Sequence, residues 1–284
     1  MTRVMTGTAR EVLDDDDLAL CGGLSVRARP FEAFDQDRMR ALSYRGALRL
    51  WLDEDERGFV SLGGTSELSR VIRVAVAPGQ RRKGVGTALF RRAVAELPAG
   101  CQVISQVGRH DPDGFAAAMG LAKQDSSPDE CTYGITLKPV RRVRVPSGTR
   151  IRSLRRFDRE RLDDLLAGAG EALPYDDDLH DEDVPLLSSL SEELSFVALR
   201  GEQPVGITLV RRDGVLPHVL MTYVPARERR RGLARALKTA SLNAMTNAGH
   251  THAFTDCATD NVAIRQLNES LGFVDTTLEM WTKP

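Results

Sequence analysis

The stretch YVPARERRRGLA, residues 223–234, decides the fold. Apolar residues typical of a strand at 219–224 end at Pro225, an arginine-rich turn follows, and Gly232 opens a run with helical apolar spacing. The pattern predicts a strand, a basic turn and a helix. Such a turn directs backbone N–H groups outward at the positive end of the helix dipole. We therefore expect a diphosphate here, held by those N–H groups and by the arginines.

The same pattern occurs earlier, as VAVAPGQRRKGVG at residues 74–86. In both copies a valine stands eight residues before the glycine that follows the basic residues. These glycines, Gly84 and Gly232, are 148 residues apart (232 minus 84). Each copy closes with a glycine and an apolar residue, at 120–121 and 272–273. A single repeat of this length predicts two similar domains rather than a solenoid.

An Arg-x-x-Gly-x-Gly/Ala motif after a strand, followed downstream by Asn261 and by Leu-Gly-Phe at 271–273, resembles the GNAT superfamily of acyl-coenzyme A-dependent N-acyltransferases. Two copies resemble its tandem members, among them mycothiol synthase and some antibiotic-modifying acetyltransferases. The resemblance implies an α/β fold of two tandem GNAT-like domains, each a mixed, mostly antiparallel sheet flanked by helices. We expect a first domain over 1–139, a linker over 140–148 and a second domain over 149–284.

Length and composition are those of an ordinary soluble chain of about two domains. The chain has 284 residues and a net charge of −1, so no global field attracts it to nucleic acid or to a membrane surface. Its four cysteines form no Cys-x-x-Cys pair, which favours free thiols in a reducing compartment. Residues 1–17 lack the apolar core of a secretory signal. We expect a cytoplasmic protein without nucleic-acid or membrane partners.

The two basic turns have two other interpretations: a solvated, positively charged loop, or a surface patch that binds nucleic acid. Glycines at a helix start are otherwise destabilising by about 0.5–1 kcal/mol each, which disfavours both alternatives. The resemblance makes the anion acyl-coenzyme A, with acetyl-coenzyme A the expected cofactor. It implies cofactor contacts from Thr222, Val224, Arg229, Arg230, Arg231, Gly232, Leu233, Ala234 and Asn261 in the second copy, and from Val74, Val76, Arg81, Arg82, Lys83, Gly84, Val85 and Gly86 in the first.

Acyl transfer to an amine needs a base and a donor for the oxyanion. Mycothiol synthase-like enzymes carry a glutamate near the start of the strand that enters the turn, and counting back fourteen residues from Gly232 reaches His218. The alternative is a strand-edge histidine without a role. The same count in the first copy reaches Arg70, which cannot act as a base, and this difference favours catalysis in the second domain. Val224 is the candidate oxyanion donor through its backbone N–H.

The general acid is less clear from the pattern. The family often places a tyrosine on the last helix, just before Leu-Gly-Phe, but this chain has Asn268 there. A tyrosine acid from that helix is therefore absent. Tyr223 or a water molecule is the candidate substitute, and the need is modest because a thiol of pKa about 8.5 is a good leaving group.

An acidic loop at 174–185 borders the acceptor site in the GNAT arrangement. Acidic residues there favour a cationic acceptor, and Tyr175 is placed to stack on it; the alternative is a solvated loop. The candidate substrate contacts are Tyr175, Asp176, Asp178 and Asp181. No metal site is expected, because His250 and His252 have no third ligand at suitable spacing.

These patterns together predict an acetyl-coenzyme A-dependent N-acetyltransferase. It moves an acetyl group to a primary amine of a small, cationic acceptor by direct attack in a ternary complex, with catalysis in the C-terminal domain. Two alternatives stay open: a protein N-acetyltransferase, and a non-catalytic acetyl-coenzyme A sensor or scaffold. The acceptor, the acyl-chain length and the oligomeric state do not follow from the sequence.

Overall fold

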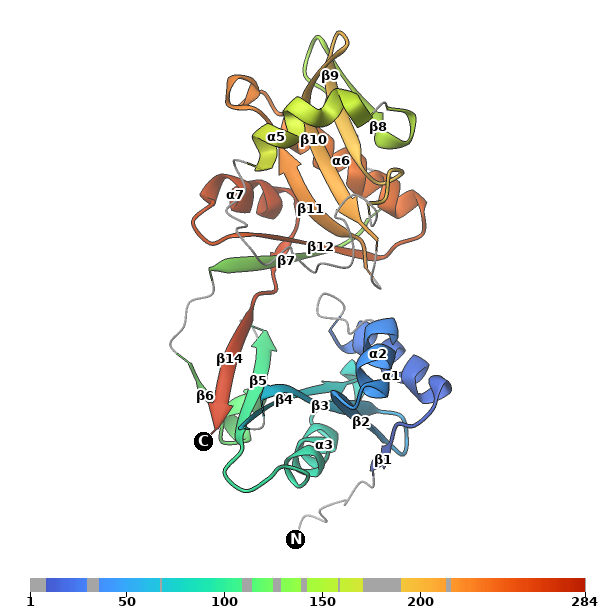
Figure 1. The fold of residues 1–284 in the computed structure, drawn as a ribbon, viewed down its shortest axis with the longest axis vertical. Coiled ribbons are helices and arrows are strands. Elements are labelled where there is room, and N and C mark those ends of the chain that lie inside the picture. The colour runs from blue at the N-terminus through green and yellow to red at the C-terminus, as the bar shows by residue number, and fades with distance from the viewer. Residues whose placement is uncertain are drawn as a thin grey trace. The chain divides into compact units, whose positions relative to one another are not determined.

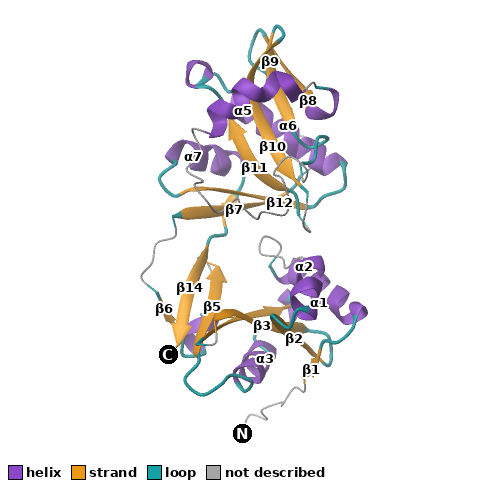
Figure 2. Ribbon diagram, in the orientation of Figure 1, coloured by secondary structure: helices purple, strands orange, loops and turns teal. Residues whose placement is uncertain are grey.

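The protein is described here by a computed structural model over residues 9–29, 36–66, 68–108, 114–124, 129–138, 142–157, 159–170, 190–212 and 216–283. The chain divides into two compact units, Met1–Pro128 with Thr276–Pro284 and Asp129–Asp275. Each unit is built on one seven-stranded mixed sheet with helices packed on it (Figures 1 and 2). The predicted α/β class, with two mixed, mostly antiparallel sheets flanked by helices, is confirmed. Within the described residues, no helix is long and apolar enough to cross a membrane.

The first unit has the strand order β1-β2-β3-β4-β5-β14-β6, in which only the β4–β5 pair is parallel. Helices α1 and α2 pack on one face of this sheet and α3 on the other. The elements are β1 (Ala9–Glu11), α1 (Asp15–Ala28), α2 (Gln36–Tyr44), β2 (Leu48–Asp53), β3 (Gly58–Ser66), β4 (Ser69–Val76), η1 (Pro78–Gln80), α3 (Val85–Val94), β5 (Gln102–Gly108), α4 (Phe115–Ala118), β6 (Ala122–Lys123) and β14 (Leu278–Lys283).

The second unit has the strand order β13-β7-β12-β11-β10-β9-β8, in which only the β11–β12 pair is parallel. Its elements are β7 (Glu130–Thr136), β8 (Thr149–Ser153), η2 (Leu154–Arg156), η3 (Arg159–Leu162), α5 (Asp163–Gly170), β9 (Phe196–Arg200), β10 (Gln203–Arg211), β11 (His218–Tyr223), η4 (Ala226–Glu228), α6 (Leu233–Asn247), β12 (His252–Ala258), α7 (Val262–Leu271) and β13 (Val274–Asp275). Met221 and Tyr223 pack toward α5, whereas Val224 packs against α6.

The expected boundaries at 139 and 149 do not match the sheets, because the two copies exchange their last strands. β7 precedes the linker but joins the second sheet, where it pairs with β12 from Thr136↔His252 to Glu130↔Ala258. β14 ends the chain but pairs with β5 in the first sheet. Alternation of buried and exposed residues fixes which face of a strand is covered, but not which of two similar sheet edges it joins. The sequence pattern therefore could not distinguish the two connections.

In each sheet the two central parallel strands pair at one end and then separate. The β11–β12 ladder is confined to His218↔Phe254, and the β4–β5 ladder ends at Val71↔Ile104. A register shift in β10–β11 between Leu209 and Val210 adds a bulge to β11 just after the paired end. Beyond this point the backbone of β11 that faces β12 is open to a ligand. We call this separation the splay.

Candidate coenzyme site and catalytic residues

The two basic turns, residues 81–86 and 229–234, have the same backbone conformation. Arg82 and Arg230 are left-handed with φ of 62° and 64°, and the helix N-caps Gly84 and Gly232 are left-handed with φ of 82° and 84°. Left-handed residues next to right-handed ones turn successive N–H groups to one side and form an anion-binding concavity. The duplication read from the sequence is thus present in the fold.

The N-termini of α3 and α6 have no side-chain cap. Each N-cap is a glycine that makes no side-chain hydrogen bond to the first turn, so the initial N–H groups of each helix are left for a ligand anion. A Cβ on Gly232 would meet only Pro146 Cγ, at 4.0 Å, so glycine is needed for its φ rather than for space. These turns fit a diphosphate in backbone geometry and in charge.

The arginines of the second basic turn divide into two roles. Arg229 Nε donates to the carbonyl oxygen of Val224 at 3.0 Å, which ties the turn to the end of β11. Arg231 lies 3.3 Å from Glu228, and that buried carboxylate also pairs with Arg200 at 2.8 Å. Arg230 is exposed. The turn is therefore held by its own ion pairs and presents Arg230 outward.

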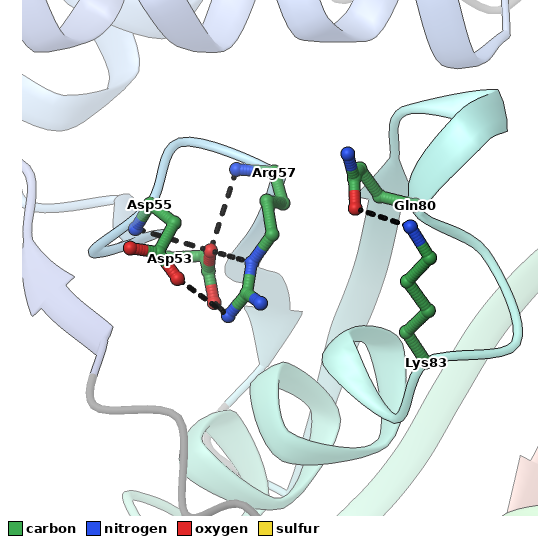
Figure 3. Close-up of polar contacts among 5 residues, drawn as sticks. All are labelled: Asp53, Asp55, Arg57, Gln80 and Lys83. Carbon is green, nitrogen blue, oxygen red and sulfur yellow. Dashed lines mark hydrogen bonds and ion pairs between the residues drawn. The ribbon is translucent and has the colours of Figure 1, made fainter.

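In the first basic turn a lysine contacts a neutral side chain, and the ion pairs lie in the neighbouring hairpin (Figure 3). Lys83 Nζ donates to Gln80 Oε1 at 3.0 Å, the counterpart of the Arg231–Glu228 pair. The neighbouring hairpin carries Asp53, which accepts from Arg57 Nε at 2.8 Å, and the Arg57 carbonyl accepts from the N–H of Ala77 at 2.9 Å. Burial alone would raise the pKa of Asp53, but the hydrogen bonds from Arg57 outweigh burial and lower it.

A hydroxyl spans the closed end of the splay in each unit. Thr255 Oγ1 donates to the carbonyl oxygen of Val219 at 2.7 Å, and Ser105 Oγ donates to that of Ile72 at 3.0 Å. Farther along β11, Thr222 Oγ1 lies 2.9 Å from Thr208 Oγ1. The predicted strand contacts Thr222 and Val224 therefore lie on the open side of the splay, next to the second basic turn.

His218 lies at the closed end of the same strand. Its ring stacks on Phe254 with centroids 4.3 Å apart, and its Nε2 is 3.0 Å from Asp256 Oδ2. The imidazole and the carboxylate lie within ion-pair distance, and the pair is charged only when the ring is protonated. Burial alone would raise the pKa of Asp256, but His218 and a 2.7 Å hydrogen bond from Thr132 outweigh burial and lower it. A histidine beside a carboxylate is the kind of arrangement that a general base needs.

Three other predicted residues have clear local surroundings. Tyr223 faces α5, where a methyl group on Gly168 would lie 2.9 Å from its hydroxyl oxygen. Asn261 caps α7 and accepts from the N–H of Ile264 at 3.3 Å. Arg70, at the position of His218 in the first unit, donates to the carbonyl oxygen of Ser69 at 3.2 Å. The first unit thus has the basic turn without the histidine–aspartate pair.

The candidate acceptor residues Tyr175, Asp176, Asp178 and Asp181 lie outside the described residues. Among the residues that the structure does describe, no group of three or more His, Cys, Asp or Glu side chains is arranged to hold a metal ion.

Sequence reasoning missed one polar pair. Lys238 on α6 is 1% exposed, and its Nζ donates to Oδ1 of the fully buried Asn268 on α7 at 2.6 Å. A signal for it was present, because Lys238 is four residues from both Ala234 and Leu242 and so falls within the apolar side of the helix. Asn268 itself stands out in the sequence only because it occupies the position of the family's tyrosine.

Comparison with known proteins agrees with this geometry. Residues 159–273 match the model of the acetyltransferase (GNAT) family. The matched segment spans 115 of the 284 residues and lies within the second unit, and acetyl-coenzyme A is the cofactor of the matched family. A search of curated proteins gave no match.

Solved structures extend the fold assignment to both units. A GCN5-related N-acetyltransferase from Sphaerobacter thermophilus is similar over 99% of this chain and 96% of its own, with 17% identity and a TM-score of 0.52. A tandem GNAT protein from the clavulanic acid biosynthesis pathway is similar over 97% of this chain and 98% of its own, with 18% identity and a TM-score of 0.47. The first of these likenesses shows the fold alone.

Proposed function

We propose that the second unit transfers an acetyl group from acetyl-coenzyme A to a primary amine of a small, cationic acceptor, by direct attack in a ternary complex. One observation carries the proposal. The strand β11 begins at the His218–Asp256 pair and ends at the second basic turn, where the N-terminus of α6 has no side-chain cap. The first unit repeats the basic turn but has Arg70 where the second has His218.

The second basic turn and the splay would hold the coenzyme. The N–H groups of residues 232–234 and the side chain of Arg230 bind the diphosphate, and Thr222 and Val224 bind the pantetheine through their backbone. The coenzyme supplies the acetyl group as a thioester, whose carbonyl is open to attack by an amine. A backbone N–H of β11 closer to His218 is the proposed donor to the oxygen of that carbonyl, because Val224, the donor expected from the sequence, is six residues, about 20 Å of extended strand, from His218.

His218 accepts the proton that the acceptor amine must lose. Asp256 favours the charged imidazolium that results, since its carboxylate lies 3.0 Å from Nε2. Phe254 stacks on the ring and fixes its plane, so the proton is taken in one direction. Removing the carboxylate would therefore affect catalysis more than coenzyme binding.

The acceptor is proposed to be cationic because residues 176–183 are strongly acidic. Tyr223 faces α5 and is the candidate contact on that side of β11, with Tyr175 beside the acidic run. The described cysteines are unpaired thiols, which fits a reducing cytoplasm.

A thiol-release assay with acetyl-coenzyme A tests the proposal against aminoglycosides, basic peptides, polyamines and cysteinyl sugars. We expect turnover with a small polyamine or amino sugar, lost in an Arg229→Ala/Arg230→Ala variant and retained in the matched Arg81→Ala/Arg82→Ala variant. Turnover with peptides alone would instead identify a protein N-acetyltransferase. Tight coenzyme binding without turnover on any acceptor would favour a sensor.

A further inference from the structure

The buried pair of Lys238 and Asn268 has no carboxylate to neutralise it among the described residues. Asn268 is fully buried, and its Nδ2 has no hydrogen-bond partner in the described part of the chain. The Lys238 ammonium lies 5.3 Å from the centroid of Phe273. A buried amine without a counter-ion is costly to a fold, so a role for it must be sought outside packing.

The first unit shows that the fold does not need this pair. Phe90 stands 148 residues before Lys238 and is buried in the same turn of α3. Ala116 is the counterpart of Asn268, because the N–H of Leu121 donates to the Ala116 carbonyl at 3.0 Å as that of Phe273 donates to the Asn268 carbonyl at 3.1 Å. The first unit therefore has two apolar residues, Phe90 and Ala116, at the positions where the second unit has the polar residues Lys238 and Asn268.

The polar pair lies beside the open end of the splay. Leu237, the neighbour of Lys238 on α6, packs against Val224 at the end of β11. Lys238 itself interacts electrostatically with Cys257 on β12, past the hydroxyl link made by Thr255. Helix α6 thus reaches from one strand of the splay to the other. Lys238 is six residues from Gly232, about 9 Å along the helix axis.

We propose that Lys238 is a catalytic residue of the second unit and gives the proton that the departing sulfur of the acyl donor takes up. This inference rests on the proposed acetyl transfer. The amine nitrogen forms a bond to the acetyl carbon, the carbon–sulfur bond breaks with its electron pair going to sulfur, and Nζ supplies the proton. The proton released by the acceptor, taken up by His218, returns through solvent to Nζ. Asn268 Oδ1 holds the ammonium in place before transfer.

The electrostatic surroundings of Lys238 suit this role. Burial lowers the pKa of Lys238 to about 7, which makes it a stronger acid than a thiol of pKa about 8.5. From β12 it is faced by Cys257, whose pKa is raised to about 11 by burial, so that thiol is neutral. From α7 it is faced by the neutral Asn268; Arg265 and Glu269 of that helix contact Tyr133 instead. Arg235 on α6 donates to Ser270.

The test uses full-length protein with bound coenzyme A and follows the absorbance of the coenzyme thiolate against pH, which needs no turnover. The ammonium of Lys238 favours the thiolate, so its loss should raise the pKa of the bound thiol. We expect the acid dissociation constant of that thiol to be about tenfold smaller in the Lys238→Met variant. We also expect kcat to fall at least tenfold while the Kd for coenzyme A stays within twofold. The Phe90→Met variant of the first unit is the matched control and should change neither.

Three outcomes would overturn the proposal. If Lys238→Met turns over with an unchanged thiolate titration, Lys238 does not protonate the sulfur, although the proposed acetyl transfer is still supported. Wild-type activity in Lys238→Arg leads to the same conclusion, since a guanidinium keeps the charge but does not release a proton near neutral pH. Absence of turnover with every acceptor removes the catalytic role together with the proposed function, and the thiolate titration then still reports whether Lys238 lies at the thiol.

Discussion

Arg229 and Val224 are joined by a 3.0 Å hydrogen bond from the guanidinium Nε to the backbone carbonyl. The first unit has the same link from Arg81 to Val76 at 3.4 Å. The arginine that begins each basic turn therefore fastens the turn to the strand that precedes it. Its neighbours Arg230 and Arg82, in the left-handed conformation, carry the next positive charges.

This division of roles predicts different effects for two adjacent arginines. Arg229→Ala should lower both the melting temperature and the affinity for coenzyme A, because it removes a structural hydrogen bond worth about 1 kcal/mol together with a charge. Arg230→Ala should weaken the affinity about tenfold and leave the melting temperature within about 1 °C, because its charge is exposed. Calorimetric titration and thermal unfolding measure the two effects. Equal loss of stability in both variants would contradict the assignment.

The His218–Asp256 contact predicts a catalytic defect without a binding defect. Asp256→Asn keeps the shape of the side chain but removes the charge 3.0 Å from His218 Nε2. We expect kcat to fall about 10- to 100-fold with the Kd for coenzyme A unchanged, as is usual when a general base loses support. Steady-state kinetics and binding on the same preparation check this. His218→Asn should cause at least the same loss, and full activity in either variant would exclude the pair from proton transfer.

Much of this site could be predicted from the sequence because local rules fix it. The glycine and arginine spacing determined the backbone of both turns, and Gly84 and Gly232 adopt the left-handed conformation that such a turn requires. Asp14 is the N-cap of α1, and its carboxylate accepts from the N–H of Asp17 at 2.8 Å. These features depend on neighbours only a few residues away.

The remaining features depend on contacts between distant segments. The pairing of β7 with β12 joins residues on either side of the linker, and two similar sheets leave the choice undetermined by local pattern. The Lys238–Asn268 hydrogen bond joins two helices, and helical spacing alone does not show that a lysine will turn inward. His218 was found by position, but its partner Asp256 comes from the neighbouring strand.

Glu228 predicts a separation of stability from binding. This buried carboxylate pairs with Arg200 at 2.8 Å and with Arg231 at 3.3 Å, and both arginines are partly exposed. Glu228→Gln should destabilise the second unit by about 1–2 kcal/mol, less than for a fully buried pair because solvent screens the arginines. Coenzyme affinity should be kept or rise up to about threefold, because a negative charge leaves the anion site.

The first unit supplies the control for Glu228. It has Gln80 at the same position, with Lys83 on it, so a neutral amide fits this turn. Gln80→Glu should therefore be tolerated, and its ion pair with Lys83 should add less than about 1 kcal/mol. Urea unfolding of both variants gives the stabilities. A loss of more than tenfold in coenzyme affinity for Glu228→Gln would show that the carboxylate organises the site rather than only the turn.

Lys238 predicts a pH-dependent stability. Its pKa of about 7 in the folded chain is lower than the ordinary value of about 10.4 that applies when the chain is unfolded. The charged amine therefore destabilises the fold fully below pH 7, less as the pH rises from 7 to about 10, and not at all above. Relative to Lys238→Met, the wild type should gain about 1.4 kcal/mol per pH unit across that window.

Guanidinium unfolding followed by circular dichroism at pH 7 and pH 9 measures this difference. We expect the free energy of unfolding of Lys238→Met, relative to the wild type, to be about 2–3 kcal/mol larger at pH 7 than at pH 9. The cost of leaving Asn268 without its donor is the same at both pH values and does not change this difference. Phe90→Met, at the matching position of the first unit, should show no such dependence because Phe90 does not titrate. A stability difference between Lys238→Met and wild type that is flat from pH 7 to pH 9 would mean that the folded Lys238 keeps an ordinary pKa. It would then stay charged at neutral pH and be too weak an acid to protonate a departing thiol.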